Sequence, residues 1–379
     1  MKNFFAAVMC LMLLMTSSLA RAAGEPQVLA DAAILVEAST GRIIWEKNAD
    51  AKFEPASMTK ILTCILSLEN LKPTDEVKLT PEVLATEDVY FDWTEHDKIS
   101  AWDMMNALML VSENGGAVAL AQTVGGDVAH FAQMMNDKAK SLGCKGSHFV
   151  NPNGLPDSNH YSTAADMARI AVYCMKNPDF RKLVGTQKNS IHWTVPKDKS
   201  AALDNTNKLL GTFNGANGIK TGWTNAAGGC LAASAVRNGV ELIAIIMHSP
   251  DTNTRFSDAA ALLDYGFGRV KMVEGLKKKD ISKNLLVRGG KKYTVRVGVD
   301  EDLNFPLLPG EDAKLFQVTI EMPRIVDAEI DAGKILGTAV LRYDGKPVAR
   351  VPIVAKEDVP AGFSFASLFV SIIAPFLNV

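Results

Sequence analysis

Three short motifs place serine, lysine and asparagine side chains at spacings that suit acyl transfer. In the first, Ser57 stands three residues before Lys60, so on a helix both side chains project from the same face. A serine hydroxyl is a weak nucleophile until a base removes its proton, and a lysine can be that base only when its amine is neutral. Burial and a second nearby cation both favour the neutral amine. We therefore expect Ser57 as the nucleophile, Lys60 as the base and Lys220 as the neighbouring cation.

The second and third motifs follow in order along the chain. Ser112-Glu113-Asn114 closes the apolar run ALMLV, and Lys220-Thr221-Gly222 lies at the edge of an expected strand. A lone S-x-x-K carries little weight, since about one is expected by chance in a chain of this length. The ordered set of S-x-x-K, Ser-x-Asn and K-T-G is far more specific.

Each of these residues has a chemical role in such a reaction. Ser112 can pass the proton from the base to the leaving nitrogen, and the amide of Asn114 can hold a peptide carbonyl of the substrate. The strand that carries Thr221 can pair with the substrate backbone, and the Thr221 hydroxyl can bind a terminal carboxylate. The backbone N–H groups of Ser57 and Trp223 are the expected oxyanion hole.

The elements that must position the first motif are a hairpin and a helix. Residues 32–37 and 42–47 are β-type runs joined by a turn, which predicts a hairpin. Pro55 then precedes an apolar run at helical spacing, and proline is tolerated at a helix start. We therefore expect Ser57 in the first turn of a buried helix.

The other two motifs require more helices and a returning sheet. Residues 102–183 are expected to be helical, and Asn238-Gly239 between two apolar runs is a strong hairpin signal. The sheet is thus assembled from both ends of this region. We predict an α/β (α+β) catalytic domain, residues 25–270, with a mainly antiparallel sheet flanked by helices.

The pattern changes after this domain. Tyr293, Val295 and Val297 alternate with polar residues, and Asp344-Gly345 joins two further short runs. Period-2 alternation with such turns predicts strands. Residues 275–357 are therefore expected to form a small all-β domain.

The N-terminal end has the features of a secretory signal. Lys2 supplies a positive charge, an uncharged apolar stretch follows, and Ala20-Arg21-Ala22 fits a cleavage site. Residues 1–22 are the predicted signal peptide. The mature protein is expected outside the cytoplasm.

The C-terminal end, residues 359–379, has no charged side chain and is predicted to be a membrane anchor. Ser364, Ser367 and Ser371 form one stripe of a helix whose other faces are apolar. Such a helix is expected to lie in the membrane interface rather than to span the bilayer. The alternative is a helix or strand packed on the β domain.

Composition excludes several other kinds of protein. The net charge of −2 gives no indication of nucleic-acid binding. Four cysteines follow the signal, and their positions favour free thiols over disulfides: Cys64, Cys144, Cys174 and Cys230. The sequence has no metal-ligand spacing, so neither a metal nor another cofactor is expected.

The motifs together resemble the low-molecular-weight penicillin-binding proteins, which are serine-type D-alanyl-D-alanine carboxypeptidases. The resemblance covers nearly the whole chain: PASMTKILT, SEN, NPNGL with HYSTAADMARI, GIKTGW, the β domain and the apolar tail. It implies a penicillin-binding/β-lactamase-like catalytic domain, a β-rich second domain and a membrane-anchoring end. Two departures are Gly115-Gly116, where the family often has Asp-Ala, and Trp223, where it has histidine or a smaller aromatic residue.

The resemblance also implies roles for individual residues. The catalytic set is Ser57, Lys60, Ser112, Asn114 and Lys220. The substrate-binding set is Thr221, Gly222, Trp223 and Arg255, of which Arg255 helps to hold the substrate carboxylate.

The implied activity is removal of the terminal D-Ala from peptidoglycan stem peptides through an acyl-enzyme, at the outer face of the cytoplasmic membrane. β-Lactams would be covalent inhibitors, and the processes served would be cell wall biogenesis and cell shape. A D,D-endopeptidase or transpeptidase of the same family stays open, because an amine could replace water as the acceptor. A class A β-lactamase is less favoured, because residues 115–219 contain no glutamate to activate a deacylating water. A penicillin-sensing receptor would need a spanning helix and a signalling domain, and an inert wall-binding scaffold would not need the three motifs.

Overall fold

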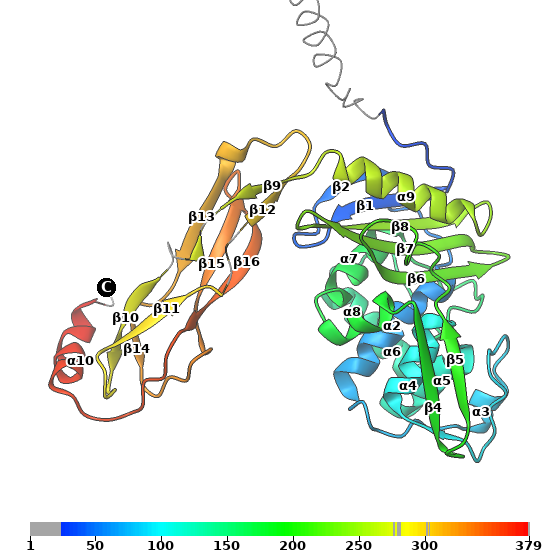
Figure 1. Cartoon of the computed structure of the whole chain (residues 1–379), viewed down its shortest axis with the longest axis horizontal. Helices are drawn as coiled ribbons and strands as arrows, with labels where there is room; N and C mark the ends of the chain where they lie inside the picture. The colour runs from blue at the N-terminus through cyan, green and yellow to red at the C-terminus, as the bar shows by residue number, and fades with distance from the viewer. Residues whose placement is uncertain (1–23, 276, 279–281, 301, 303, 378–379) are drawn as a thin grey trace, which may run out of the picture.

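The computed structural model describes residues 24–275, 277–278, 282–300, 302 and 304–377, so the predicted signal peptide lies outside the described residues. Two units are visible in Figure 1: a mixed helix-and-sheet unit and an elongated β unit that carries the C-terminal helix at its far end. This is the predicted fold class.

A five-stranded sheet forms the centre of the first unit. Its strand order is β2-β1-β8-β7-β6, and every neighbouring pair is antiparallel. The strands are β1 (Ala32–Glu37), β2 (Ile43–Lys47), β6 (Ala216–Thr224), β7 (Gly228–Arg237) and β8 (Val240–Ser249). Both predicted hairpins are present, and Asn238 and Gly239 have the positive φ angles, 51° and 79°, that a two-residue turn requires.

Strand β1 contributes side chains to the hydrophobic cores on both faces of the sheet. All of its residues are buried, because it lies between two strands and its side chains alternate between two cores. Ile34 and Val36 pack with the main helical cluster, whereas Ala33 and Leu35 pack with α9 (Thr254–Phe267). Figure 1 shows α9 on one face of the sheet and the other helices on the opposite face.

The helices lie between the first and third motifs. Residues 102–183, which were predicted to be helical, are mostly so, but residues 142–163 form a non-helical segment between two of the helices. The helices between the motifs are α2 (Lys60–Asn70), α3 (Pro81–Leu84), α4 (Ala101–Leu110), α5 (Asn114–Gly125), α6 (Val128–Ser141), α7 (Ala164–Cys174) and α8 (Pro178–Gly185). Ser100 caps α4 by accepting a hydrogen bond from the backbone nitrogen of Asp103, and serine is among the residues preferred at this position. The four cysteines are free thiols, as predicted, and Cys144 is the least buried of them.

A separate three-stranded sheet was not predicted. It has the order β3-β4-β5 and consists of β3 (Lys98–Ile99), β4 (Lys188–Val195) and β5 (Ser200–Asp204). In β4 only Ile191 and Trp193 are buried, because one face of the strand is in solvent. Trp193 packs edge-on against Phe91 and tilted against Trp93, so this sheet supports the segment that precedes β3.

The β unit begins with a link to the first unit. Strands β9 (Lys271–Glu274) and β12 (Asn304–Leu307) pair with each other, and Arg42 of the first unit forms an ion pair with Glu311 just beyond them. The larger sheet has the order β13-β15-β16-β11-β10-β14. Its elements are β10 (Lys283–Arg288), β11 (Thr294–Gly298), the 3₁₀ turn η3 (Ala313–Leu315), β13 (Phe316–Glu321), β14 (Ile325–Asp327), β15 (Ile335–Tyr343) and β16 (Lys346–Ala355).

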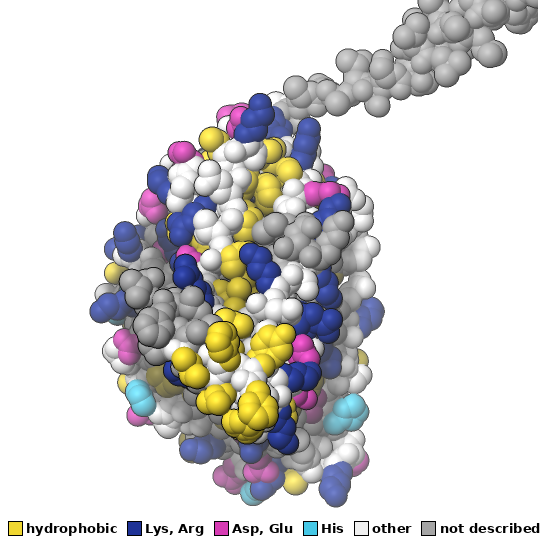
Figure 2. Space-filling view, turned by 90° about the vertical axis from the view of Figure 1, so that its left-hand side faces the viewer, with side chains coloured by type: hydrophobic (Ala, Val, Ile, Leu, Met, Phe, Trp, Pro, Cys, Tyr) yellow, Lys and Arg dark blue, Asp and Glu magenta, His cyan; other side chains and the backbone are white. Residues whose placement is uncertain are grey.

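The C-terminal helix α10 (Phe365–Leu377) packs against β10. Two serines of the predicted stripe turn toward the β unit: Ser367 is 3% exposed, and the Ser364 hydroxyl lies 3.4 Å from the Gly290 carbonyl oxygen. The opposite face is apolar and exposed, as Figure 2 shows, and includes Phe363, Phe365, Leu368, Phe369 and Ile372. Among the described residues, no helix is long and apolar enough to cross a membrane.

Candidate active site

Ser57 lies in a short turn before the helix, not in the helix itself. The 3₁₀ turn η1 (Ala56–Thr59) carries it, and α2 starts at Lys60. Ala56 has a φ of 46°, which is unusual for a residue with a side chain. The prediction of a first helical turn was therefore wrong in type, although Ser57 and Lys60 still project together.

Lys60 is completely buried and hydrogen-bonded at its tip. Its Nζ lies 2.8 Å from Ser57 Oγ, 2.7 Å from Asn114 Oδ1 and 2.6 Å from the Asn153 carbonyl oxygen. Burial, and next the charge of Lys220, hold the pKa of Lys60 well below its usual range, while Glu113 acts in the opposite direction. These are the two conditions that the sequence argument required for a neutral amine.

His160 is the other titratable group beside this turn. Burial lowers its pKa to about 4, and its Nε2 lies 2.8 Å from Thr59 Oγ1. Its Nδ1 accepts from the backbone of Val150, so Nε2 carries the proton that it donates to Thr59. A neutral imidazole with a hydrogen bond at each ring nitrogen indicates a structural role.

Ser112 and Glu113 of the second motif lie between α4 and α5, and Asn114 is the first residue of α5. Ser112 has a φ of 67°, which is unusual for a residue with a side chain. Asn114 is occupied at both ends: Oδ1 accepts from Lys60, and Nδ2 lies 3.2 and 3.0 Å from the carbonyl oxygens of Glu87 and Asp88. Its Nδ2 therefore donates to carbonyls of the protein itself, whereas the sequence suggested that it holds a carbonyl of the substrate.

The third motif lies on β6, the edge strand of the sheet. Lys220 is 1% exposed, and burial followed by the charge of Arg255 lowers its pKa to about 7. The Thr221 hydroxyl lies 2.7 Å from that of Thr206. A Cβ on Gly222 would come within 3.0 Å of the Ser57 nitrogen, so glycine here lets β6 approach the nucleophile.

Two further predicted residues flank this strand. Trp223 is 43% exposed. Arg255 is buried, and its guanidinium donates to the backbone carbonyls of Gly222 and Cys230 rather than pointing into open solvent. It thus ties β6 to β7 and adds positive charge beside Lys220.

Two contributors were not predicted from the sequence. Asn153 provides a carbonyl acceptor for Lys60, and the side chain of Asn151 accepts from the Gly154 nitrogen at 2.7 Å to shape that loop. Glu113 is fully buried within the second motif. The sequence signals for these residues were the NPNGL stretch and the middle residue of SEN. Neither signal indicates which atom of the residue faces the site.

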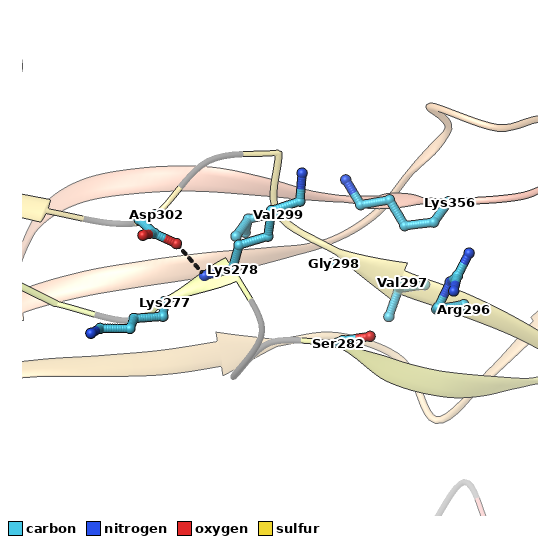
Figure 3. Close-up of a pocket in the computed structure, with 9 residues that line it drawn as sticks. All are labelled: Lys277, Lys278, Ser282, Arg296, Val297, Gly298, Val299, Asp302 and Lys356. Atoms are coloured by element: carbon cyan, nitrogen blue, oxygen red, sulfur yellow. Dashed lines mark hydrogen bonds between the residues drawn. The ribbon is translucent and has the colours of Figure 1, made fainter.

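A separate cavity of about 900 Å³ lies in the β unit, and no residue of the three motifs lines it (Figure 3). Lys278, Arg296 and Lys356 contribute positive charge. Lys356 pairs with Asp300 at 2.6 Å, which compensates part of this charge, and the carboxylate of Asp302 accepts from the backbone nitrogen of Lys278 at 2.7 Å. The cavity is distinct from the site around Ser57.

Comparison with known proteins gives the same family for both units. Residues 19–251 match the D-alanyl-D-alanine carboxypeptidase family model (peptidase S11), and residues 271–361 match the C-terminal domain of penicillin-binding protein 5. D-alanyl-D-alanine carboxypeptidase DacF of Bacillus subtilis is 32% identical over 340 residues, which cover 88% of this chain and 87% of the relative. D-alanyl-D-alanine endopeptidase of Escherichia coli is 31% identical over 249 residues, which cover 64% and 79%.

A solved structure agrees with these relatives. The crystal structure of penicillin-binding protein 5 from Haemophilus influenzae matches with a TM-score of 0.64 and 27% identity, covering 89% of this chain and 99% of that one. Sequence, site and fold together lead to one conclusion: the chain belongs to the D-alanyl-D-alanine carboxypeptidase family and is a serine-type D-Ala-D-Ala carboxypeptidase.

Proposed function

We propose that the enzyme removes the terminal D-Ala of peptidoglycan stem peptides through an acyl-enzyme on Ser57, with Lys60 as the general base. The observation that carries this assignment is the buried Lys60 Nζ, 2.8 Å from Ser57 Oγ. A neutral amine has two N–H bonds and one lone pair. The two N–H bonds match Asn114 Oδ1 and the Asn153 carbonyl oxygen, which leaves the lone pair for the Ser57 proton.

The chemical steps follow from these contacts. Lys60 takes the proton as Ser57 Oγ attacks the carbonyl carbon between the two D-alanines, and the oxyanion faces the backbone N–H groups of Ser57 and Trp223. The C–N bond then breaks, and Ser112 relays the proton held by Lys60 to the leaving amine of D-alanine, so Lys60 is neutral again. Water next attacks the acyl carbon and gives a proton to Lys60, which passes it to Ser57 Oγ as the C–O bond to the shortened peptide breaks.

Binding of the substrate is assigned to the edge of β6. An edge strand presents unpaired backbone groups that an extended peptide can complete. Lys220, in its protonated form, and Thr221 face the terminal carboxylate in this proposal, and Gly222 leaves room for the substrate beside Ser57. Arg255 acts on the same carboxylate through the charge it adds and through its hold on the Gly222 carbonyl.

β-Lactams, which mimic D-Ala-D-Ala, should acylate Ser57 and leave slowly. No glutamate occurs in residues 115–219. The nearby Glu113 is fully buried and engaged by three backbone N–H groups, so it is unsuited to activating a deacylating water.

The decisive experiment combines two measurements on one preparation. Release of free D-alanine from a defined pentapeptide should be rapid, and intact-protein mass spectrometry should show a lasting penicillin adduct on the Ser57 peptide. Ser57→Ala should lose both. A cross-linked stem-peptide dimer, offered in parallel, reports on endopeptidase activity, and faster cleavage of the dimer than of the pentapeptide would reassign the substrate.

We also propose where the enzyme works. The predicted signal peptide, residues 1–22, would direct it across the cytoplasmic membrane, and residues 359–379 would attach it to the outer face. The support is the exposed apolar face of α10, where Phe365 is 84% and Phe369 62% exposed at the end of the β unit remote from its link to the first unit. In this division the catalytic domain is residues 25–270 and the β domain residues 275–357.

A further inference from the structure

Two successive residues of the second motif grip one segment beside the active site. Asn114 Nδ2 binds the carbonyl oxygens of Glu87 and Asp88, as described above. Glu113 Oε2 accepts from the backbone nitrogens of Tyr90 and Phe91 at 2.7 and 3.1 Å. Residues 87–91 are therefore clamped at one end by Asn114, which also contacts Lys60, and at the other end by Glu113.

Both oxygens of the Glu113 carboxylate accept hydrogen bonds from backbone nitrogens. Glu113 is 0% exposed, and its Oε1 also accepts from the Gly115 nitrogen at 2.9 Å, at the start of α5. A buried carboxylate is tolerated only where such donors replace water. The segment that it holds presents Tyr90, which is 58% exposed.

Gly115 and Gly116 make the space for this carboxylate. A Cβ on Gly116 would lie 3.0 Å from Glu113 Cγ and 2.6 Å from Met104 Sδ, and a Cβ on Gly115 would lie 3.1 Å from Glu113 Oε1. The departure from Asp-Ala at these positions is thus explained by the buried glutamate. Where the family pattern has an acid directly after the asparagine, this chain has one directly before it.

We infer that Glu113 is a positioning residue for the carboxypeptidase reaction: it fixes residues 87–91 against the Asn114–Lys60 pair. The inference rests on the proposed role of Lys60 as the base. Glu113 itself touches neither substrate nor the reacting atoms in this assignment. It acts through its two neighbours.

The charges around Lys60 give this inference a direction. Lys220 on β6 favours the neutral amine, and Glu113 favours the charged one. His160, which contacts Thr59 of this turn, is neutral above a pKa of about 4. Burial raises the pKa of Glu113, against the hydrogen bonds from Tyr90, Gly115 and Phe91. Removing its charge therefore lowers the pKa of Lys60 further and extends the neutral base to lower pH.

The test is the pH profile of β-lactam acylation by the full chain with Glu113→Gln, which keeps the shape and removes the charge. The acidic limb should move to lower pH by roughly 0.5–1 unit. KM for a stem pentapeptide should rise several-fold as residues 87–91 loosen. Hydrogen exchange at Tyr90 and Phe91 should become faster, whereas Glu113→Asp should retain the wild-type limb because it keeps the charge.

Glu37→Gln is the matched control. Glu37 is 2% exposed and its carboxylate accepts from the Ser39 and Thr40 nitrogens at 2.9 Å, but it is not among the groups that shift Lys60. It should lower the melting temperature and leave the acylation profile in place. An unmoved limb together with unchanged exchange in Glu113→Gln would overturn the inference. Undiminished acylation by Ser57→Ala or Lys60→Arg would instead overturn the proposed function, so the two failures are distinguishable.

Discussion

Gly154 and Ala56 meet through their backbones so closely that a Cβ on Gly154 would lie 1.9 Å from the Ala56 carbonyl oxygen. Each has a positive φ, 84° and 46°. Ala56 directly precedes Ser57, and Asn153, whose carbonyl receives Lys60, directly precedes Gly154. The contact therefore fixes the nucleophile and one acceptor of the base relative to each other.

Gly154→Ala should displace the Ser57 turn. The positive φ alone costs about 1–3 kcal/mol for a residue with a side chain, and the clash with backbone adds to it. We expect a lower melting temperature and a loss of acylation on the order of 100-fold, because small misplacements of reacting groups are costly. Gly143→Ala is the control: Gly143 has a φ of 81° but open space around it, so only the stability should fall. Equal acylation by both variants would contradict the positional argument.

Lys60→Arg tests the base itself. Arginine keeps the positive charge but does not give up its proton near neutral pH. Acylation by a β-lactam should fall by a factor on the order of 10² to 10⁴. Lys47→Arg is the comparison, since Lys47 also donates to backbone carbonyls, those of Val28 and Ala30, away from the three motifs. Near-native acylation by Lys60→Arg would show that another group removes the Ser57 proton.

Lys220 should set the basic limb of kcat/KM for a stem peptide. Its pKa is lowered to about 7, so above that pH the amine loses the charge that would hold the substrate carboxylate. We expect kcat/KM to fall about tenfold per unit on the alkaline side. Arg255→Gln removes a positive neighbour, raises the pKa of Lys220 and should move this limb to higher pH. Arg255→Lys keeps the charge and should keep the limb, and a shift of equal size in both variants would point to lost packing instead.

The sequence was most informative where local chemistry determines local structure. Asp344-Gly345 and Asn238-Gly239 form their turns because both residues of each pair take positive φ, which these residue types tolerate. Ser57 and Lys60 meet because they are three residues apart, even though the turn is a 3₁₀ turn rather than an α-helix. These features depend on neighbours along the chain.

Features that depend on distant segments were missed. Nothing near Glu113 in the sequence indicates that its carboxylate accepts from the Tyr90 and Phe91 nitrogens. A pattern of side chains also gives no information on the backbone carbonyl of Asn153, which accepts from Lys60. Ser364 and Ser367 were identified as part of a polar stripe, but that these two serines face the β unit depends on contacts with β10 and Gly290. The β4–β5 hairpin was overlooked because so few of its residues are buried.

Arg42 should hold the two units in one orientation. Its side chain, 16% exposed, pairs with Glu311 and lies 5.5 Å from the centre of the Phe316 ring. Arg42→Ala should broaden the small-angle scattering profile and expose the link near β9 to protease, while cleavage of a short soluble pentapeptide stays unchanged. Arg237→Ala is the control, since Arg237 pairs with Asp264 within the first unit. It should lower stability without changing the scattering, and an unaltered profile in Arg42→Ala would exclude this role.

The last prediction concerns membrane attachment through α10. Burying one phenylalanine contributes about 1.5–3 kcal/mol, so Phe365→Glu with Phe369→Glu should weaken binding to vesicles of phosphatidylethanolamine and phosphatidylglycerol by on the order of 100-fold or more. High salt should have little effect on the wild-type protein, because the exposed face is apolar rather than basic.

Leu315→Glu with Tyr293→Glu is the control for attachment through α10. These residues are 42% and 51% exposed on the same unit but lie outside the helix. A chain ending at Asp358 should stay off the vesicles and still release D-alanine from a soluble pentapeptide. Wild-type protein that floats free of vesicles, or that salt alone removes, would contradict hydrophobic attachment, and equal loss of binding in the control pair would shift the contact from α10 to the rest of the β unit.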